Sequence, residues 1–149
     1  MTMNGTAQTM DLVQCLAMVA QNELGPNAPA EAYKAQCVAT HCWIISQSGY
    51  PSVLGAEPGA AALAAAQEVA HVLVTYNGQV CFTPYFASAS TGTASAAESG
   101  AMTGAWLQAV DSPYDQSVSS HSEHERQFQR HGPLLPPDAA GPHPRCDGH

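Results

Sequence analysis

The sequence predicts a mixed α+β domain, with N-terminal helices packed on a small antiparallel sheet. Two observations predict this class. Apolar residues recur at helical spacing through residues 11–47. Further on, the β-rich runs 71–76 and 79–83 flank Asn77-Gly78, and such a dipeptide between two strands is the strongest short-range signal for a hairpin.

The first helix is expected over residues 11–24. Leu12, Leu16 and Val19 recur at i, i+4 and i+7, so they form one apolar stripe along this helix. Gly25 follows at once and is a typical residue at a helix C-terminus. The segment is therefore predicted to be an amphipathic helix that packs on the core through one side.

Glu23 occupies the next position of this stripe, close to the C-terminal end of the helix. Partial burial and the negative end of the helix dipole both disfavour an ionised carboxylate. A general acid that works near neutral pH needs such an environment. The alternative is a glutamate that turns out to water at a frayed helix end. Position alone leaves both interpretations open.

Two further helices are predicted. The second runs from about residue 29 to residue 47, with Pro29 in its first turn. The third covers the alanine-rich residues 60–70 and follows from helix propensity. The buried side of the second helix is predicted from Tyr33, Cys37, Ile44 and Ile45.

The segment after the two β-rich runs contains mostly small residues. Residues 88–104 consist largely of Ser, Thr, Gly and Ala, which predicts a long loop of the kind that often carries function. Residues 106–110 are predicted to be a short strand, which the Ser- and Pro-containing residues 111–115 end.

Composition divides the chain into three parts: a flexible N-terminus at 1–10, a domain at 11–120 and a tail at 121–149. The tail contains five of the seven histidines and three of the four basic residues, and no periodic apolar pattern. We expect it to be disordered or loosely attached, and its deletion to cost little stability. Its histidine spacing fits no defined metal site.

Charge excludes one class of partner. Through residue 120 the chain has one lysine against eight carboxylates, a net charge near −7. A surface of this sign does not favour nucleic acid or an anionic membrane. An uncharged polymer such as a glycan is compatible with it.

The cysteines predict neither a disulfide framework nor a zinc ribbon, because their number is odd and no C-x-x-C occurs. Cys15 and Cys37 lie in apolar helical patterns and are expected to be small buried residues. The chain also has no apolar run of the ~18 residues that a membrane span needs. Residues 1–10 lack the features of a signal peptide.

Four blocks of sequence resemble the stage II sporulation protein D family. Residues 19–24, VAQNEL, and 30–39, AEAYKAQCVA, are similar to its opening motif. Residues 72–79, VLVTYNGQ, are similar to its hairpin, and residues 84–93, PYFASASTGT, to its loop motif Y-x-x-S-x-S-x-G-x-T. Residues 106–115, WLQAVDSPYD, are similar to its closing motif. The blocks occur in the family's order.

The resemblance implies a lytic transglycosylase that cleaves the bond between N-acetylmuramic acid and N-acetylglucosamine in denuded peptidoglycan and leaves 1,6-anhydro ends. It implies Glu23 as the catalytic acid and base and an extracytoplasmic location. No cofactor is predicted. The implied partners are peptidoglycan glycan strands, together with a cell-wall amidase or other sporulation proteins. The alternatives are a noncatalytic peptidoglycan-binding module or amidase modifier, and a truncated family member without activity.

The matched motifs also suggest substrate-binding residues. For Lys34 the alternative is a surface ion pair with Glu31. For the loop residues between positions 85 and 93 the alternative is turn chemistry alone. No zinc site is expected, because residues 47–66 contain neither the His nor the Cys with which some family members bind zinc. The candidate substrate-binding residues are Lys34, Gln36, Tyr85, Ser88, Ser90, Gly92 and Thr93.

Overall fold

The computed structural model describes residues 1–3, 6–47, 51–53, 57–85, 92–99 and 104–113. It forms two compact units, residues 1–85 and 86–149. The described part contains four helices and a two-stranded antiparallel sheet, which agrees with the mixed α+β class predicted from the sequence. The predicted tail at 121–149 lies outside the described residues.

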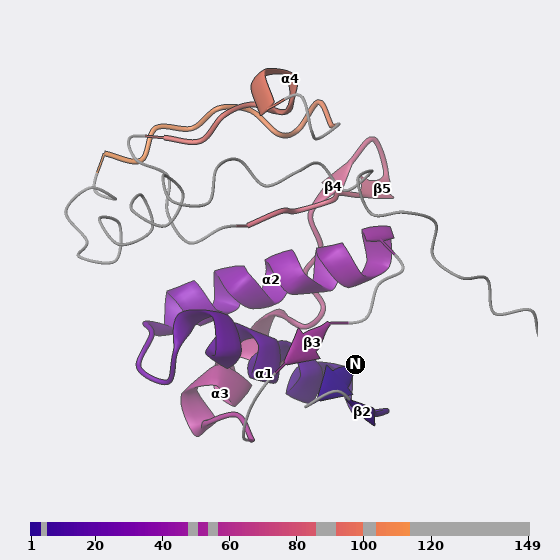
Figure 1. Cartoon of the computed structure of the whole chain (residues 1–149), viewed down its shortest axis with the longest axis vertical. Coiled ribbons are helices and arrows are strands. Elements are labelled where there is room, and N and C mark those ends of the chain that lie inside the picture. The colour runs from indigo at the N-terminus through magenta and orange to yellow at the C-terminus, as the bar shows by residue number, and fades with distance from the viewer. Residues whose placement is uncertain (4–5, 48–50, 54–56, 86–91, 100–103, 114–149) are drawn as a thin grey trace, which may run out of the picture. The chain divides into compact units, whose positions relative to one another are not determined.

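Three helices form the centre of the first unit: α1 (Leu12–Leu24), α2 (Ala30–Gln47) and α3 (Ala60–Val69). Each packs against the other two, and α2 lies across α1 and α3 (Figure 1). Their bounds agree with the predicted helices to within one residue at every end. The local signals of the sequence therefore fixed the helical part of the fold.

Helix α1 has clear signals at both ends. The carboxylate of Asp11 accepts hydrogen bonds from the backbone N–H groups of Val13 at 2.8 Å and Gln14 at 3.4 Å, which caps the N-terminus. Gly25 ends the helix with a φ of 80°, and its N–H donates to the carbonyl of Gln21 at 2.9 Å.

The main core lies where the three helices meet and is built mostly from small side chains, which allow close approach of the helices. Tyr33 is its largest residue, and its hydroxyl donates to the carbonyl of Gly25 at 2.5 Å, which ties α2 to the end of α1. The buried members of this core are Leu16, Ala17, Ala20, Tyr33, Cys37, Ala62, Ala65 and Ala66.

A second cluster, Met18 and Val19, packs against Met1 and Met10 on another side of α1. The single apolar stripe predicted for α1 is therefore too simple. Six consecutive residues from Cys15 to Ala20 are buried, whereas Leu12 at one end of the stripe is 37% exposed. Helix α1 is covered on more than one side, so apolar spacing alone could not give its orientation.

Short strands lie beside this second cluster. Strand β1 (Thr2–Met3) pairs antiparallel with β2 (Thr6–Ala7) and parallel with β3 (Ser52–Val53). The β3 strand also contacts α1. The sequence had indicated only a flexible segment at residues 1–10, because two-residue strands carry no periodic pattern.

The second sheet of the first unit contains β4 (Thr75–Tyr76) and β5 (Gln79–Val80), with Thr75 opposite Val80. Both strands are much shorter than the runs 71–76 and 79–83 predicted from composition. Residues 72–74 carry exposed apolar side chains, and the N–H of Val74 donates to Cys42 Sγ of α2 at 3.2 Å. The β-rich composition thus marks an extended segment of which only part is paired.

In the second unit, the predicted loop contains a short helix, α4 (Ala96–Ser99). Ser95 and Glu98 cap it reciprocally: Ser95 N–H donates to Glu98 Oε2 at 2.8 Å, and Glu98 N–H donates to Ser95 Oγ at 3.3 Å. The strand predicted at 106–110 is not formed, and a turn at residues 105–106 and one bridge between Gly92 and Asp111 take its place.

In the part of the chain that the structure describes, no helix combines the length and the apolar character needed to cross a membrane.

Candidate functional site

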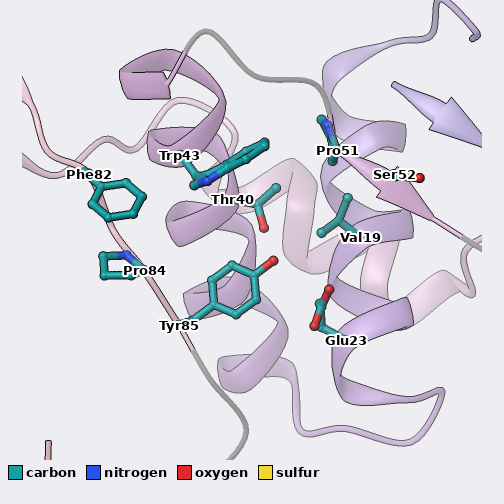
Figure 2. A pocket seen from close by; sticks show the side chains of 9 residues that line it. All are labelled: Val19, Glu23, Thr40, Trp43, Pro51, Ser52, Phe82, Pro84 and Tyr85. Atoms are coloured by element: carbon teal, nitrogen blue, oxygen red, sulfur yellow. The ribbon is translucent and has the colours of Figure 1, made fainter. Parts of the chain in front are cut away.

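The first unit contains an open pocket of about 340 Å³ between α1, α2 and the segment after β5. Glu23 of α1 and Tyr85 both point into it, and Thr40 and Trp43 line it farther along α2 (Figure 2). The lining residues are Val19, Glu23, Thr40, Trp43, Pro51, Ser52, Phe82, Pro84 and Tyr85.

The last turn of α1 carries Glu23 into this pocket. Its side chain is exposed, so the partial burial that we expected from its place on the apolar stripe is wrong. The stripe changes environment along the helix: Val19 is 3% exposed, and Glu23 one turn later lies at the open end. What the structure provides is a carboxylate directed at an open pocket.

Tyr85 lies across the pocket from Glu23 and is 42% exposed. Burial raises the pKa of the Tyr85 hydroxyl, and the nearby charge of Glu23 raises it further. Hydrogen bonds with Thr40 and Gln36 lower the pKa of Tyr85, whereas a hydrogen bond with Glu23 raises it. The hydroxyl therefore contacts groups from both α1 and α2.

Two hydrogen bonds hold the segment that carries Tyr85. The hydroxyl of Thr83 donates to the carbonyl of Ala39 on α2 at 2.8 Å. The N–H of Cys81 donates to the carbonyl of Val74 at 2.9 Å, and Cys81 itself is 1% exposed. Thr83 thus ties this segment to α2, Cys81 ties it to the residue before β4, and Tyr85 follows two residues after Thr83.

Gln36, another predicted substrate-binding residue, is buried and does not line the pocket. Gln36 is 8% exposed and Thr40 is 2% exposed. Gln36 Nε2 donates to Thr40 Oγ1 at 3.4 Å, one helical turn away. These two buried polar side chains lie next to the Tyr85 hydroxyl, so the structure gives Gln36 a supporting place.

Lys34 does not line the pocket and instead forms two ion pairs. Its Nζ lies 2.9 Å from Glu31 Oε1 and 2.6 Å from Glu68 Oε2 of α3. Hydrogen bonds to Glu68 and then Glu31 raise the pKa of Lys34. The ion pair with Glu31 is the structural alternative that the sequence left open, and Glu68 adds a link between α2 and α3.

The remaining candidates lie after residue 85. Gly92 and Thr93 belong to the second unit, where Thr93 N–H donates to the Val110 carbonyl at 2.8 Å and Val110 N–H donates to Thr93 Oγ1 at 3.0 Å. A Cβ on Gly92 would lie 2.7 Å from the Val110 carbonyl oxygen, which explains why glycine stands there. Ser88 and Ser90 lie outside the described residues.

Several of the lining residues were not among the predicted site residues. Thr40 and Trp43 follow Gln36 at i+4 and i+7 on α2, so helical spacing from one matched motif residue could have identified them. Pro51, Ser52 and Phe82 had no such signal, because they join the pocket through tertiary packing.

Among the described residues, no group of three or more His, Cys, Asp or Glu side chains is arranged to hold a metal ion. The described cysteines Cys15, Cys37, Cys42 and Cys81 are free and buried. The prediction that Cys15 and Cys37 are small buried residues is therefore confirmed. Burial raises the pKa of Cys37 to about 11 and also raises that of Cys15.

Comparison of the chain with protein-family models, with curated proteins and with solved structures found no match.

Proposed function

We propose that this chain is a lytic transglycosylase that cleaves denuded peptidoglycan and uses Glu23 as its acid and base. The observation that carries the proposal is that Glu23, the residue selected from the opening motif, points into a pocket opposite Tyr85 of the loop motif (Figure 2). These residues are 62 positions apart in the sequence, so their meeting did not follow from either motif alone.

The composition of the pocket supports this class of reaction. Glu23 is the single carboxylate among the described residues that line it. Hydrolysis of a glycosidic bond ordinarily uses two carboxylates that flank the bond. An intramolecular displacement needs one group, because the same carboxyl serves as acid in the first half and as base in the second. A one-carboxylate pocket therefore fits a lytic transglycosylase better than a hydrolase.

The chemistry is balanced without water. The Glu23 carboxyl donates its proton to the glycosidic oxygen as the bond from muramic C1 to that oxygen breaks, and the electron pair leaves with N-acetylglucosamine. The Glu23 carboxylate then accepts the proton of the muramic 6-hydroxyl while O6 bonds to C1. The products are a 4-hydroxyl and a 1,6-anhydro ring, and the enzyme returns to its protonated form.

The walls of the pocket suit a neutral sugar. Trp43, Phe82 and Tyr85 offer aromatic surface, and Thr40 and Ser52 add hydroxyl groups. Aromatic side chains provide large rigid contact area, and that of Tyr ends in a polar atom.

The resemblance also predicts a hairpin at residues 72–79, and we include this hairpin in the proposal. The positive φ angles of Asn77, 52°, and Gly78, 78°, between the paired strands β4 and β5 support an Asn-Gly turn there.

A second candidate function is glycan binding without cleavage, by a wall-binding module or an amidase modifier. The observation that favours it is the exposure of Glu23. A carboxylate in contact with water can accept hydrogen bonds from the hydroxyl groups of a glycan without transferring a proton. The aromatic walls would serve a binding module equally well.

One experiment separates the two functions. Purified protein is incubated with peptidoglycan from which the stem peptides have been removed, and the products are analysed by mass spectrometry. A lytic transglycosylase gives fragments with 1,6-anhydro ends, each 18 mass units below the hydrolysis product, the mass of one water. Sedimentation of the protein with the glycan without such fragments would support the binding module instead.

The matched variants are Glu23→Gln and Glu57→Gln. Glu23→Gln keeps the volume and removes the transferable proton, so we expect loss of anhydro products with retained folding, on the scale of at least about 100-fold. Glu57 is exposed, lies outside the pocket lining and bonds Gln14, so its Gln variant should retain activity. Normal turnover by Glu23→Gln would contradict the assignment.

A further inference from the structure

We propose that Tyr85 is a positioning residue for Glu23, at the end of a one-way chain of hydrogen-bond donors that begins at Gln36. The motif resemblance had suggested only that Tyr85 binds substrate. The proposed role rests on the lytic transglycosylase function for its catalytic consequence, whereas the contacts themselves stand independently of it.

The direction of this series of hydrogen bonds follows from the donors that its residues carry. Gln36 Nε2 donates to Thr40 Oγ1 at 3.4 Å. The oxygen of Thr40 then accepts, so its own proton is available for the Tyr85 oxygen, which Thr40 and Gln36 both contact. A tyrosine hydroxyl has one proton, and with donors at its oxygen this proton is directed to the acceptor opposite, the Glu23 carboxylate.

Gln36 and Thr40, the first two residues of this hydrogen-bond series, are held in place by burial. Gln36 and Thr40 are 8% and 2% exposed, on adjacent turns of α2. A polar group buried this deeply is costly unless it is hydrogen-bonded, so their mutual bond and their contact with Tyr85 determine their rotamers. Each bond in such a series polarises the next, which strengthens the final donor.

The last member of this hydrogen-bond series, Glu23, is exposed by contrast. Glu23 lies on the last turn of α1, where water competes for its carboxylate and no core packing fixes its side chain. A hydroxyl held from α2 at one carboxylate oxygen would orient the group and leave the second oxygen free to exchange a proton with substrate. The pocket is therefore preorganised from the helix that does not carry the acid.

Titration of Tyr85 tests the contacts without any activity. Tyrosine rings labelled at Cζ are followed by NMR, and the Tyr85 signal is assigned from its loss in Tyr85→Phe. In Glu23→Gln the pKa of Tyr85 should fall, because the negative charge that raises it is removed. In Thr40→Val the pKa should rise, because a donor to the phenolate oxygen is lost.

Among the described residues that line the pocket, the titratable groups are Glu23 and Tyr85. No other lining group therefore contributes to the shifts in the Tyr85 pKa that the two variants produce. Glu57→Gln is the control for a general change in surface charge and should leave the Tyr85 pKa near the wild-type value. Thr40→Ser keeps the hydroxyl and should restore wild-type titration, which separates loss of the donor from loss of packing.

Turnover of denuded peptidoglycan provides the second measurement. Tyr85→Phe should lower kcat about 10- to 100-fold with little change in KM, since misplacement of a catalytic group mainly affects the chemical step. A rise in KM with unchanged kcat would instead assign Tyr85 to substrate binding and overturn the proposal.

The outcomes distinguish this inference from the proposed function. Opposite pKa shifts of Tyr85 in Glu23→Gln and Thr40→Val support the positioning chain even if no anhydro product forms, and in that case the enzyme assignment fails by itself. A Tyr85 pKa that does not respond to Glu23→Gln overturns the inference, even if wild-type protein cleaves glycan.

Discussion

Two pairs of buried residues on helix α2 differ in chemistry. Tyr33 and Cys37 pack with α1 and α3 in an apolar core. Gln36 and Thr40 are almost equally buried but polar, and they lie next to the Tyr85 hydroxyl at the pocket. The apolar pair provides stability, and the polar pair provides a fixed arrangement of donors.

The two pairs make different demands on the sequence. An apolar core needs only shape and volume, so its residues are interchangeable within limits. A buried polar pair needs specific partners in specific positions, so each residue depends on the next. Substitutions of the apolar pair should therefore act on stability, and those of the polar pair should act on the site.

The largest expected effect is that of Tyr33→Ala in the apolar pair. Tyr33 is 1% exposed and also bonds the Gly25 carbonyl. Loss of a large aromatic side chain from a core costs about 3–5 kcal/mol, which should lower the thermal midpoint by more than about 10 °C. Calorimetry or circular dichroism measures it.

Ile45→Ala is the matched control for that variant. Ile45 was predicted to lie on the buried side of α2, but the structure shows it 44% exposed. Its truncation should cost less than about 1 kcal/mol. Equal losses for Tyr33→Ala and Ile45→Ala would mean that the faces of α2 are not assigned correctly.

A smaller effect is expected from Cys37→Ser, which places a hydroxyl in the apolar core. Cys37 is fully buried, and its Sγ lies 3.7 Å from the Leu16 carbonyl. The variant should be less stable than wild type by about 1–3 kcal/mol in denaturant unfolding. In the wild type, the raised pKa and burial of Cys37 should keep it unmodified by a thiol reagent at pH 8 until the protein unfolds.

Peptide mapping by mass spectrometry locates the modified cysteine. Rapid labelling of Cys37 in the native protein would show that the core opens more readily than its packing indicates. Cys37→Ala serves as the companion variant, since it removes the sulfur without adding a polar atom.

His41, on the same helix, is expected to make the stability of the folded protein depend on pH. Burial lowers its pKa below 6.5, and a backbone hydrogen bond with Ala70 only partly opposes this. The unfolded chain therefore binds a proton more readily than the folded protein, so the stabilising contribution is present above pH 6.5 and is lost as the pH falls through the folded pKa. Urea unfolding between pH 7.5 and pH 5 measures it.

The slope of this dependence should decrease in His41→Gln and remain in His71→Gln, because the side chain of His71 is exposed. A wild-type slope that persists in His41→Gln would assign the effect to another group.

The smallest effect is expected from Lys34→Met. The lysine pairs with Glu31 and Glu68 at the surface, where ion pairs contribute little to stability. Turnover of denuded peptidoglycan should also remain near the wild-type rate, because Lys34 lies outside the pocket lining. A large rise in KM would return Lys34 to the substrate-binding residues that the motif suggested.

The sequence predicted the helices well because their signals are local. Asp11 and Gly25 set the ends of α1, and alanine propensity sets α3. The capping pair Ser95 and Glu98 was also visible as S-x-x-E, and attention to it would have found α4 inside the predicted loop.

The strands and the exposure of Glu23 could not be predicted in the same way. Strands of two residues have no measurable period, so the β-rich runs suggested longer pairing than the structure contains. The position of Glu23 on a stripe predicted burial, but the protein that would cover the stripe ends one turn earlier, at Val19.

By itself the sequence determined the helical framework, the small apolar residues of its core and the choice of Glu23 as the candidate acid, because each depends on spacing or on a motif within a short stretch of chain. Only the tertiary structure decided which residues stand opposite that acid. It placed Tyr85 in the same pocket and buried Gln36 and Thr40 next to its hydroxyl, since helix packing sets which faces of α1 and α2 meet the segment after β5.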